Sequence, residues 1–143
     1  MFRLSSAKWI ALHYYHDNWG VSFRNVRGRK GFNGARFENL VASHLLKFCH
    51  YFQDVFGLNA GLFYLRDLEK REVDFLLTWE ETPWLIVECK LAPGGSLTAL
   101  NYFADRLAIK QRFLVVQEEG VDHVDRATGV RALSANRFLT ALV

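Results

Sequence analysis

The sequence predicts an α/β domain in which a long helix precedes three strands, and a helix, a strand and a last helix follow. Apolar residues recur at intervals of three and four between residues 35 and about 56, as on the buried side of a helix. Apolar runs at 72–79 and 84–91 flank a short polar break, which is typical of a hairpin. A wholly apolar core at 112–116 is typical of a strand covered on both faces.

The segments around these elements carry weaker patterns. Residues 1–20 are rich in aromatic side chains without a clear period, and we expect a strand or an irregular packing segment there. Residues 24–36 mix glycines with basic residues and contain no acid, which indicates a basic loop. Residues 62–65 predict the first of the three strands, and Ser96 is a candidate N-cap for the second helix.

At the C-terminal end, 121–133 predicts a small hairpin around Thr128-Gly129, and the last helix is expected to begin at Ser134. We therefore divide the chain into an N-terminal aromatic segment with its basic loop, residues 1–30, and one α/β domain, residues 31–143.

Composition narrows the class of protein. The chain has 143 residues, of which 50% are hydrophobic and 23% charged, so a disordered protein is excluded. A net charge of +3 and a pI near 9.0 permit a polyanionic partner. Cys49 and Cys89 match neither a zinc site nor a disulfide framework, and buried thiols in a reducing compartment are expected. No apolar stretch is long enough for a membrane span and no signal core is present, so we expect a cytoplasmic location and no membrane partner.

Charged residues interrupt the two apolar runs: Asp74 lies in the first, and Glu88 and Lys90 lie in the second. Alternation along a strand places Glu88 and Lys90 on one face. If Thr78 pairs with Trp84 in the hairpin, Asp74 falls opposite Glu88 on that same face. Two carboxylates about 5 Å apart repel by about 3 kcal/mol at an effective dielectric constant of 20, so a divalent cation is expected between them. The alternative is an ordinary solvated strand face with a surface ion pair.

Asp74 and the tripeptide Glu88-Cys89-Lys90, with Glu38 on the preceding helix, resemble the PD-(D/E)XK nuclease superfamily. The resemblance implies a restriction-endonuclease-like three-layer fold, with a central mixed sheet flanked by helices in the order α-β-β-β-α-β-α. It also implies that Asp74, Glu88 and Cys89 bind Mg²⁺ or Mn²⁺ and that Lys90 assists the attacking water. Glu38 would be a further catalytic residue that contacts the metal or the water.

A longer part of the chain, about residues 31 to 117, is similar to an uncharacterised domain at the C-terminus of many prokaryotic AAA-type ATPases. The similarity is carried by the segments 34–47, 64–67, 70–75 and 88–91. In those proteins an ATPase and a winged-helix segment precede the domain. The P-loop motif G-x-x-x-x-G-K-[ST] does not occur in this chain, so no ATP is expected to bind in that manner. The chain is either a stand-alone relative or a fragment of a longer protein.

Basic residues just before the long helix are candidates for contacts with DNA phosphates, although a solvated linker is equally consistent with their pattern. These candidates are Arg24, Arg27, Arg29, Lys30 and Arg36. Gln111, Arg66 and Glu72 are weaker candidates for a place in the site.

Two functions remain as hypotheses from the sequence. The first is a metal-dependent endonuclease or exonuclease that hydrolyses phosphodiester bonds in DNA. The second is a catalytically inactive module that binds nucleic acid or protein and derives from the C-terminus of an AAA-type ATPase. A homodimer and an ATPase partner are open under both hypotheses.

Overall fold

The computed structural model describes residues 10–14 and 32–142 of the chain, with side chains from residue 33 onward. The elements are β1 (Ile10–Tyr14), α1 (Phe32–Phe56), β2 (Ala60–Asp67), β3 (Glu72–Trp79), β4 (Thr82–Lys90), α2 (Thr98–Arg106), β5 (Gln111–Val116), β6 (Asp122–Val124), β7 (Arg131–Ser134) and α3 (Ala135–Thr140). The mixed α/β class is confirmed, and the expected helices and strands follow one another in the expected order. The predicted hairpin at 121–133 is confirmed as β6 and β7, and β1 is a strand within the segment where a strand or irregular packing was expected.

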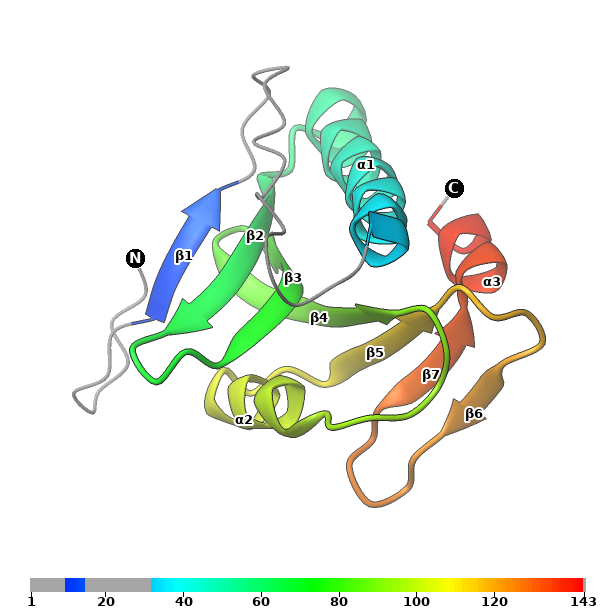
Figure 1. Ribbon diagram of the computed structural model, residues 1–143. Helices are drawn as coiled ribbons and strands as arrows, with labels where there is room; N and C mark the ends of the chain where they lie inside the picture. Colours follow the sequence, from blue (N-terminus) through cyan, green and yellow to red (C-terminus); the bar gives the residue numbers. More distant parts are fainter. Residues whose placement is uncertain (1–9, 15–31, 143) are drawn as a thin grey trace.

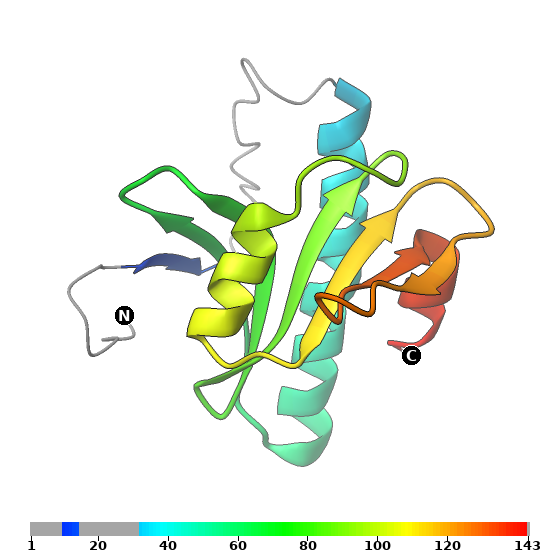
Figure 2. The same ribbon diagram turned by 90° about the horizontal axis from the view of Figure 1, so that it is seen from below.

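The described strands form one seven-stranded sheet in the order β1-β2-β3-β4-β5-β7-β6. Neighbours from β1 to β4 are antiparallel, whereas β5 is parallel to both β4 and β7. Helices α1 and α3 cover one face of the sheet and α2 covers the other, which gives three layers (Figures 1 and 2). Within the described ranges, none of the helices combines the length and the apolar composition that crossing a bilayer requires.

The two faces of the sheet have separate hydrophobic cores. On one face Phe37, Val41, Leu45 and Cys49 of α1 pack as a stripe with four-residue spacing, which confirms the predicted helix period. On the other face Leu100, Phe103 and Ala104 of α2 pack against the strands. Strand β4 serves both cores, because its side chains alternate: Leu85, Val87 and Cys89 belong to the α1 core, and Ile86 belongs to the α2 core.

The hairpin of β3 and β4 contains a bulge that the sequence did not indicate. Glu80 and Glu81 form its two-residue loop with φ of 47° and 64°, as in a type I′ turn. Thr78 pairs with Pro83, and the next pair along the ladder is Leu77 with Leu85. The predicted pair of Thr78 with Trp84 is therefore wrong, because Trp84 is an extra residue on β4 with no partner on β3.

The ring of Trp84 explains why this extra residue is accommodated. It stacks on Phe48 of α1 with ring centroids 6.3 Å apart, and its centroid is 6.0 Å from that of Trp79. A bulge turns a side chain that the ladder does not use toward such neighbours. Beyond it, from Leu77–Leu85 to Phe75–Val87, the pairs have the predicted register, in which Asp74 would fall opposite Glu88.

Two expected helix starts differ in detail. The N-cap residue of α2 is Leu97, not Ser96, and no side chain caps this end. Ser96 still contributes, because its Oγ accepts a hydrogen bond from the Thr98 amide at 3.3 Å. The last helix begins next to Ser134, as predicted, with Ser134 as its N-cap residue.

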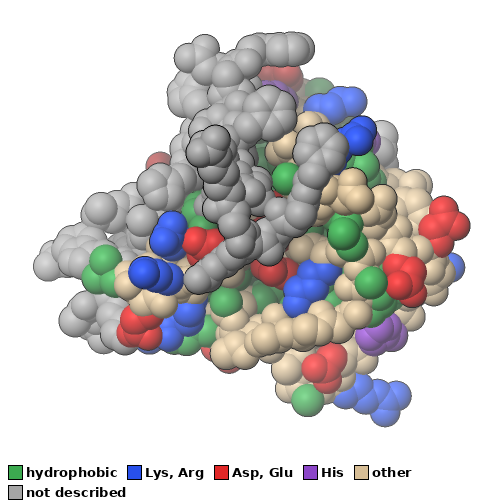
Figure 3. Space-filling view, in the orientation of Figure 1, with side chains coloured by type: hydrophobic (Ala, Val, Ile, Leu, Met, Phe, Trp, Pro, Cys, Tyr) green, Lys and Arg blue, Asp and Glu red, His purple; other side chains and the backbone are tan. Residues whose placement is uncertain are grey.

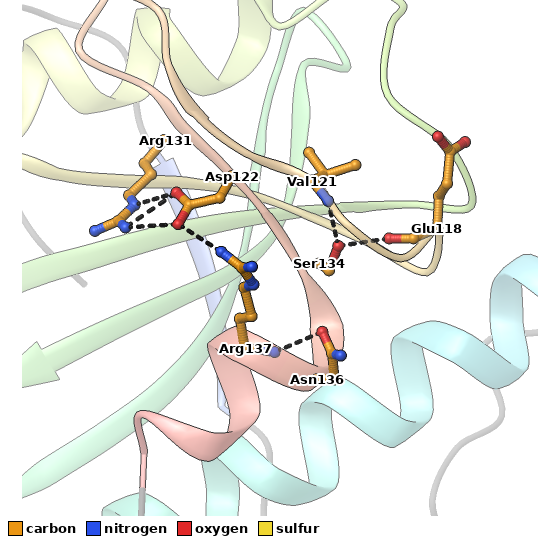
Figure 4. Close-up of polar contacts among 7 residues, drawn as sticks. All are labelled: Glu118, Val121, Asp122, Arg131, Ser134, Asn136 and Arg137. Atoms are coloured by element: carbon orange, nitrogen blue, oxygen red, sulfur yellow. Dashed lines mark hydrogen bonds and ion pairs between the residues drawn. The ribbon is translucent and has the colours of Figure 1, made fainter.

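The hairpin of β6 and β7 is joined to its surroundings by polar contacts (Figure 4). Both oxygens of Asp122 accept hydrogen bonds from Arg131, and Oδ2 also accepts one from Arg137 of α3. The hydrogen bond from Arg131 is the main reason that the pKa of Asp122 lies below its ordinary value. Buried Ser134 donates to the Glu118 carbonyl and accepts from the Val121 amide. These contacts fix the short edge strand β6 to β7 and α3.

Candidate active site

Asp74 lies in a second bulge, on β3. Leu65 of β2 pairs with Val73, and Phe63 pairs with Leu76, so β3 has one residue more than β2 in this interval. Val73 and Leu76 consequently both pack in the α2 core although they are three positions apart. Bulges re-aim side chains and are common beside active sites. The sequence did not indicate this one.

The carboxylate of Asp74 reaches across to β4. Its Oδ2 accepts a hydrogen bond of 2.8 Å from the backbone N–H of Cys89, and the residue is only 7% exposed. The last pair between β3 and β4 is Phe75 with Val87, so the carboxylate binds an amide just beyond the end of the ladder. Asp74 therefore lies directly beside the tripeptide Glu88-Cys89-Lys90.

The three residues of this tripeptide point to different faces of β4. The thiol of Cys89 is 3% exposed and packs in the α1 core, so it is not on the face that carries Glu88. Alternation places Glu88 and Lys90 on the face of Ile86, which belongs to the α2 core. Both side chains are partly exposed at the end of the strand. The Cys89 contribution here is thus its backbone amide, which orients Asp74.

The ammonium of Lys90 is bound by the loop between β4 and α2. Its Nζ donates to the carbonyl of Gly94 at 3.0 Å and to that of Ser96 at 3.1 Å. A Cβ atom added to Gly95 would lie 2.8 Å from Nζ. The signal for this loop in the sequence is the pair of consecutive glycines, Gly94 and Gly95, that follows Pro93 shortly after the tripeptide.

The helix glutamate is near the same edge of the sheet. Figures 1 and 2 both show the N-terminal turns of α1 beside the C-terminal end of β4, where Glu88 and Lys90 lie. Phe37 is buried in the core next to β4, and its neighbour Glu38 is half-buried. The prediction that Glu38 acts in catalysis stays a prediction.

Asp74 and Glu88 have the chemistry of magnesium ligands, but together they supply two side chains and not three. Among the residues with described side chains, no three of the type His, Cys, Asp or Glu are grouped so that they could hold a metal ion. The predicted metal contacts of Glu38 and Cys89 stay predictions, and the thiol of Cys89 lies on the other face of β4. Magnesium often binds one or two carboxylates and completes its shell with water and substrate phosphate, so the pair fits this ion. A carboxylate can accept at both oxygens, so the bond from the Cys89 amide does not by itself prevent Asp74 from binding a metal ion.

The weaker candidates lie elsewhere or bind each other. Gln111 pairs with Leu85 at the start of β5, whereas Glu88 is level with Leu114, about 10 Å farther along the strand. Arg66 and Glu72 pair across β2 and β3 and form an exposed ion pair of 3.3 Å. Gln111 thus lies away from the strand end that carries Glu88, and the charges of Arg66 and Glu72 are paired with each other.

Four of the five predicted DNA-contacting residues lie outside the described residues: Arg24, Arg27, Arg29 and Lys30. The fifth, Arg36, is exposed in the second turn of α1. On the visible described surface in Figure 3, acidic and basic side chains are interspersed. The described part thus presents a mixed charge on that face, and the predicted basic loop stays a prediction.

Comparison with known proteins assigns the family. A search of curated proteins and a search of solved structures each found no match. A family model described as "Domain of unknown function (DUF4143)" matches residues 33–138, from the first turn of α1 to α3. This domain is found in the C-terminal region of AAA-type ATPase-like proteins. Since the match covers well over half of the 143 residues, the chain belongs to the DUF4143 family.

Proposed function

We propose that this domain is a metal-dependent nuclease that hydrolyses phosphodiester bonds in DNA, with its site at the C-terminal end of β4. The observation that carries the proposal is the 2.8 Å bond between buried Asp74 and the Cys89 amide. It brings an acid from β3 against a strand end that carries a second acid, Glu88, and an amine, Lys90. The three-layer α/β fold is compatible with the restriction-endonuclease-like architecture that the sequence resemblance implies, and this compatibility supports the proposal.

The residues would divide the work by their chemistry. Asp74 and Glu88 would hold a magnesium ion, whose charge would stabilise the developing negative charge on a phosphate. The Cys89 amide fixes the orientation of the Asp74 carboxylate, which lowers the reorganisation needed when substrate binds. Lys90 would donate a hydrogen bond to a phosphate oxygen or orient the attacking water. The basic residues before α1 would bind the DNA backbone.

The test is a cleavage assay on supercoiled, linear and single-stranded DNA with Mg²⁺ or Mn²⁺, and with EDTA as the metal-free control. Asp74→Asn and Lys90→Ala should each lower the cleavage rate by about 100-fold or more. Lys110→Ala is the matched control and should cleave DNA like the wild type. Lys110 is exposed and precedes β5, which runs parallel to β4, so it lies at the end of the sheet opposite the proposed site. Cleavage that persists in Lys90→Ala would refute the role given to this lysine.

A second function is favoured by the contacts of Lys90. Its ammonium already donates to two loop carbonyls, and the residues with described side chains include no group of three His, Cys, Asp or Glu that could hold a metal ion. Both features also suit an inactive site in a module that binds nucleic acid or protein. This alternative predicts no metal-dependent cleavage. It predicts DNA binding that weakens with salt and with neutralisation of Arg27, Arg29 and Lys30.

A further inference from the structure

The loop between β4 and α2 surrounds the ammonium of Lys90 with backbone oxygen atoms. The carbonyls of Gly94 and Ser96 accept hydrogen bonds from Nζ at 3.0 and 3.1 Å. A lysine ammonium has three N–H groups, so two of them are used and one remains. The loop therefore restricts an otherwise flexible four-carbon side chain to one region.

The loop itself is tied to the helix that follows. The hydroxyls of Ser96 and Thr98 are 2.7 Å apart, and Ser96 Oγ also accepts from the Thr98 amide at 3.3 Å. Thr98 is the first residue of α2, which packs on the sheet through the buried Leu100 and Phe103. The carbonyl that Ser96 offers to Lys90 is thus connected to a packed element.

The two glycines of the loop differ in what a side chain would meet. Both have positive φ, +115° for Gly94 and +78° for Gly95, so alanine is strained at either position. A Cβ on Gly94 would meet nothing within 4 Å. A Cβ on Gly95 would lie 2.8 Å from Nζ of Lys90 and 3.9 Å from its Cε. Only Gly95 leaves the space that the ammonium occupies.

We propose that Gly95 is a positioning residue for Lys90. Its missing side chain lets the ammonium dock on the Gly94 and Ser96 carbonyls, and the third N–H is left for an anionic oxygen. The assignment of this oxygen to a phosphodiester rests on the proposed function. The docking of Lys90 on the two carbonyls is independent of that function.

The first test measures how accessible the Lys90 amine is to acetylation by an N-hydroxysuccinimide ester. Rates are read by mass spectrometry of the full chain after digestion and divided by the rate at exposed Lys110 in the same sample. In Gly95→Ala the relative rate at Lys90 should rise by about tenfold, which corresponds to about 1.4 kcal/mol. In Gly120→Ala it should stay at the wild-type value. Gly120 is the matched control, because it has the same φ of +78° and a Cβ there would meet nothing within 4 Å. Equal rates in the two variants would overturn the proposal.

A double-mutant cycle keeps the test decisive if Gly95→Ala unfolds the protein. Removal of the Lys90 side chain also removes the atom that a new Cβ would meet, so Lys90→Ala/Gly95→Ala should fold. Gly95→Ala should lower the folding equilibrium constant about tenfold less in the Lys90→Ala background than in the wild-type background. An equal shift in both backgrounds would mean that Gly95 is needed only for its own backbone conformation and not for the position of Lys90, and the proposal would be wrong.

Cleavage assays separate this inference from the function on which part of it rests. If the wild type cleaves DNA, Gly95→Ala should lower kcat about tenfold more than Gly120→Ala, with KM changed similarly in both. If the wild type does not cleave DNA while acetylation at Lys90 still rises only in Gly95→Ala, the nuclease proposal fails and the positioning role stands.

Discussion

Replacement of Asp74 separates its two roles, because alanine and asparagine remove different properties. Asp74→Ala deletes the acceptor of the 2.8 Å bond from the Cys89 amide and leaves that buried N–H without its partner. Asp74→Asn removes the charge but keeps a carbonyl oxygen of similar size in the same place. A comparison of the two variants therefore distinguishes the hydrogen bond from the charge.

The expected magnitude follows from the geometry. Hydrogen bonds to charged groups contribute about 1.5–3 kcal/mol to stability, and Asp74 is only 7% exposed, so water replaces little of it. Asp74→Ala should accordingly lower the free energy of unfolding by about 2 kcal/mol, or Tm by about 5–10 °C for a domain of this size. Asp74→Asn should change it by less than about 1 kcal/mol, because the lost charge assistance is offset by relief of repulsion from Glu88.

The assay is urea and thermal unfolding monitored by circular dichroism, without divalent metal. Calorimetric binding of Mn²⁺ to each folded variant is measured in parallel. Both variants should lose the metal-dependent signal, and only Asp74→Ala should lose stability. Equal destabilisation by alanine and asparagine would refute the reasoning, because the charge and not the hydrogen bond to Cys89 would then be the stabilising property.

Three further predictions concern the rest of the domain. Burial raises the pKa of the Cys49 thiol from 9.0 to about 11, so between pH 9 and 11 the thiol is deprotonated in the unfolded chain and not in the folded one. The free energy of unfolding should therefore fall by about 2–3 kcal/mol across this pH range. Urea unfolding of Cys49→Ala should show no such fall. Hydrogen bonds from Arg131 and Arg137 lower the pKa of Asp122 below 3.8. The ionised carboxylate therefore stabilises the fold above pH 3.8, and this stabilisation is lost as the pH falls further. Acid unfolding of Asp122→Asn should lack this pH-dependent loss of stability. The Phe52 ring lies 4.7 Å from that of Trp79, and Phe52→Ala should cost about 2–3 kcal/mol of unfolding free energy by calorimetry, because this ring is only partly buried.

The parts of the fold that the sequence predicted are those coded by local periodicity. The stripe of α1 and the predicted strand at 72–79 needed only spacing, and both agree with the structure. The neighbours of β7 did not follow from its sequence, because a parallel pair with β5 joins segments that are separated by a loop and another strand. The place of β1 beside β2 likewise depends on a contact across about fifty residues.

The candidate site shows the same division between local and non-local information. Alternation along one strand was enough to put Glu88 and Lys90 on one face. The position of Asp74 depends on a bulge that is defined only by comparison of two strands, Leu65 with Val73 and Phe63 with Leu76. The docking of Lys90 depends on a turn whose φ angles two glycines permit but do not dictate.

The bulge at Trp84 connects the aromatic end of the hairpin to the site at its other end. The Glu80-Glu81 turn pairs Thr78 with Pro83, and this register, continued without a bulge, would pair Asp74 with Val87. It would also turn the apolar side chains of β4 away from the core face of β3, since a one-residue slip reverses the faces. The extra residue restores the match of Leu77 with Leu85 and carries the Cys89 amide to the Asp74 carboxylate. The aromatic contacts of Trp84 therefore stabilise the strand register on which the proposed active site depends.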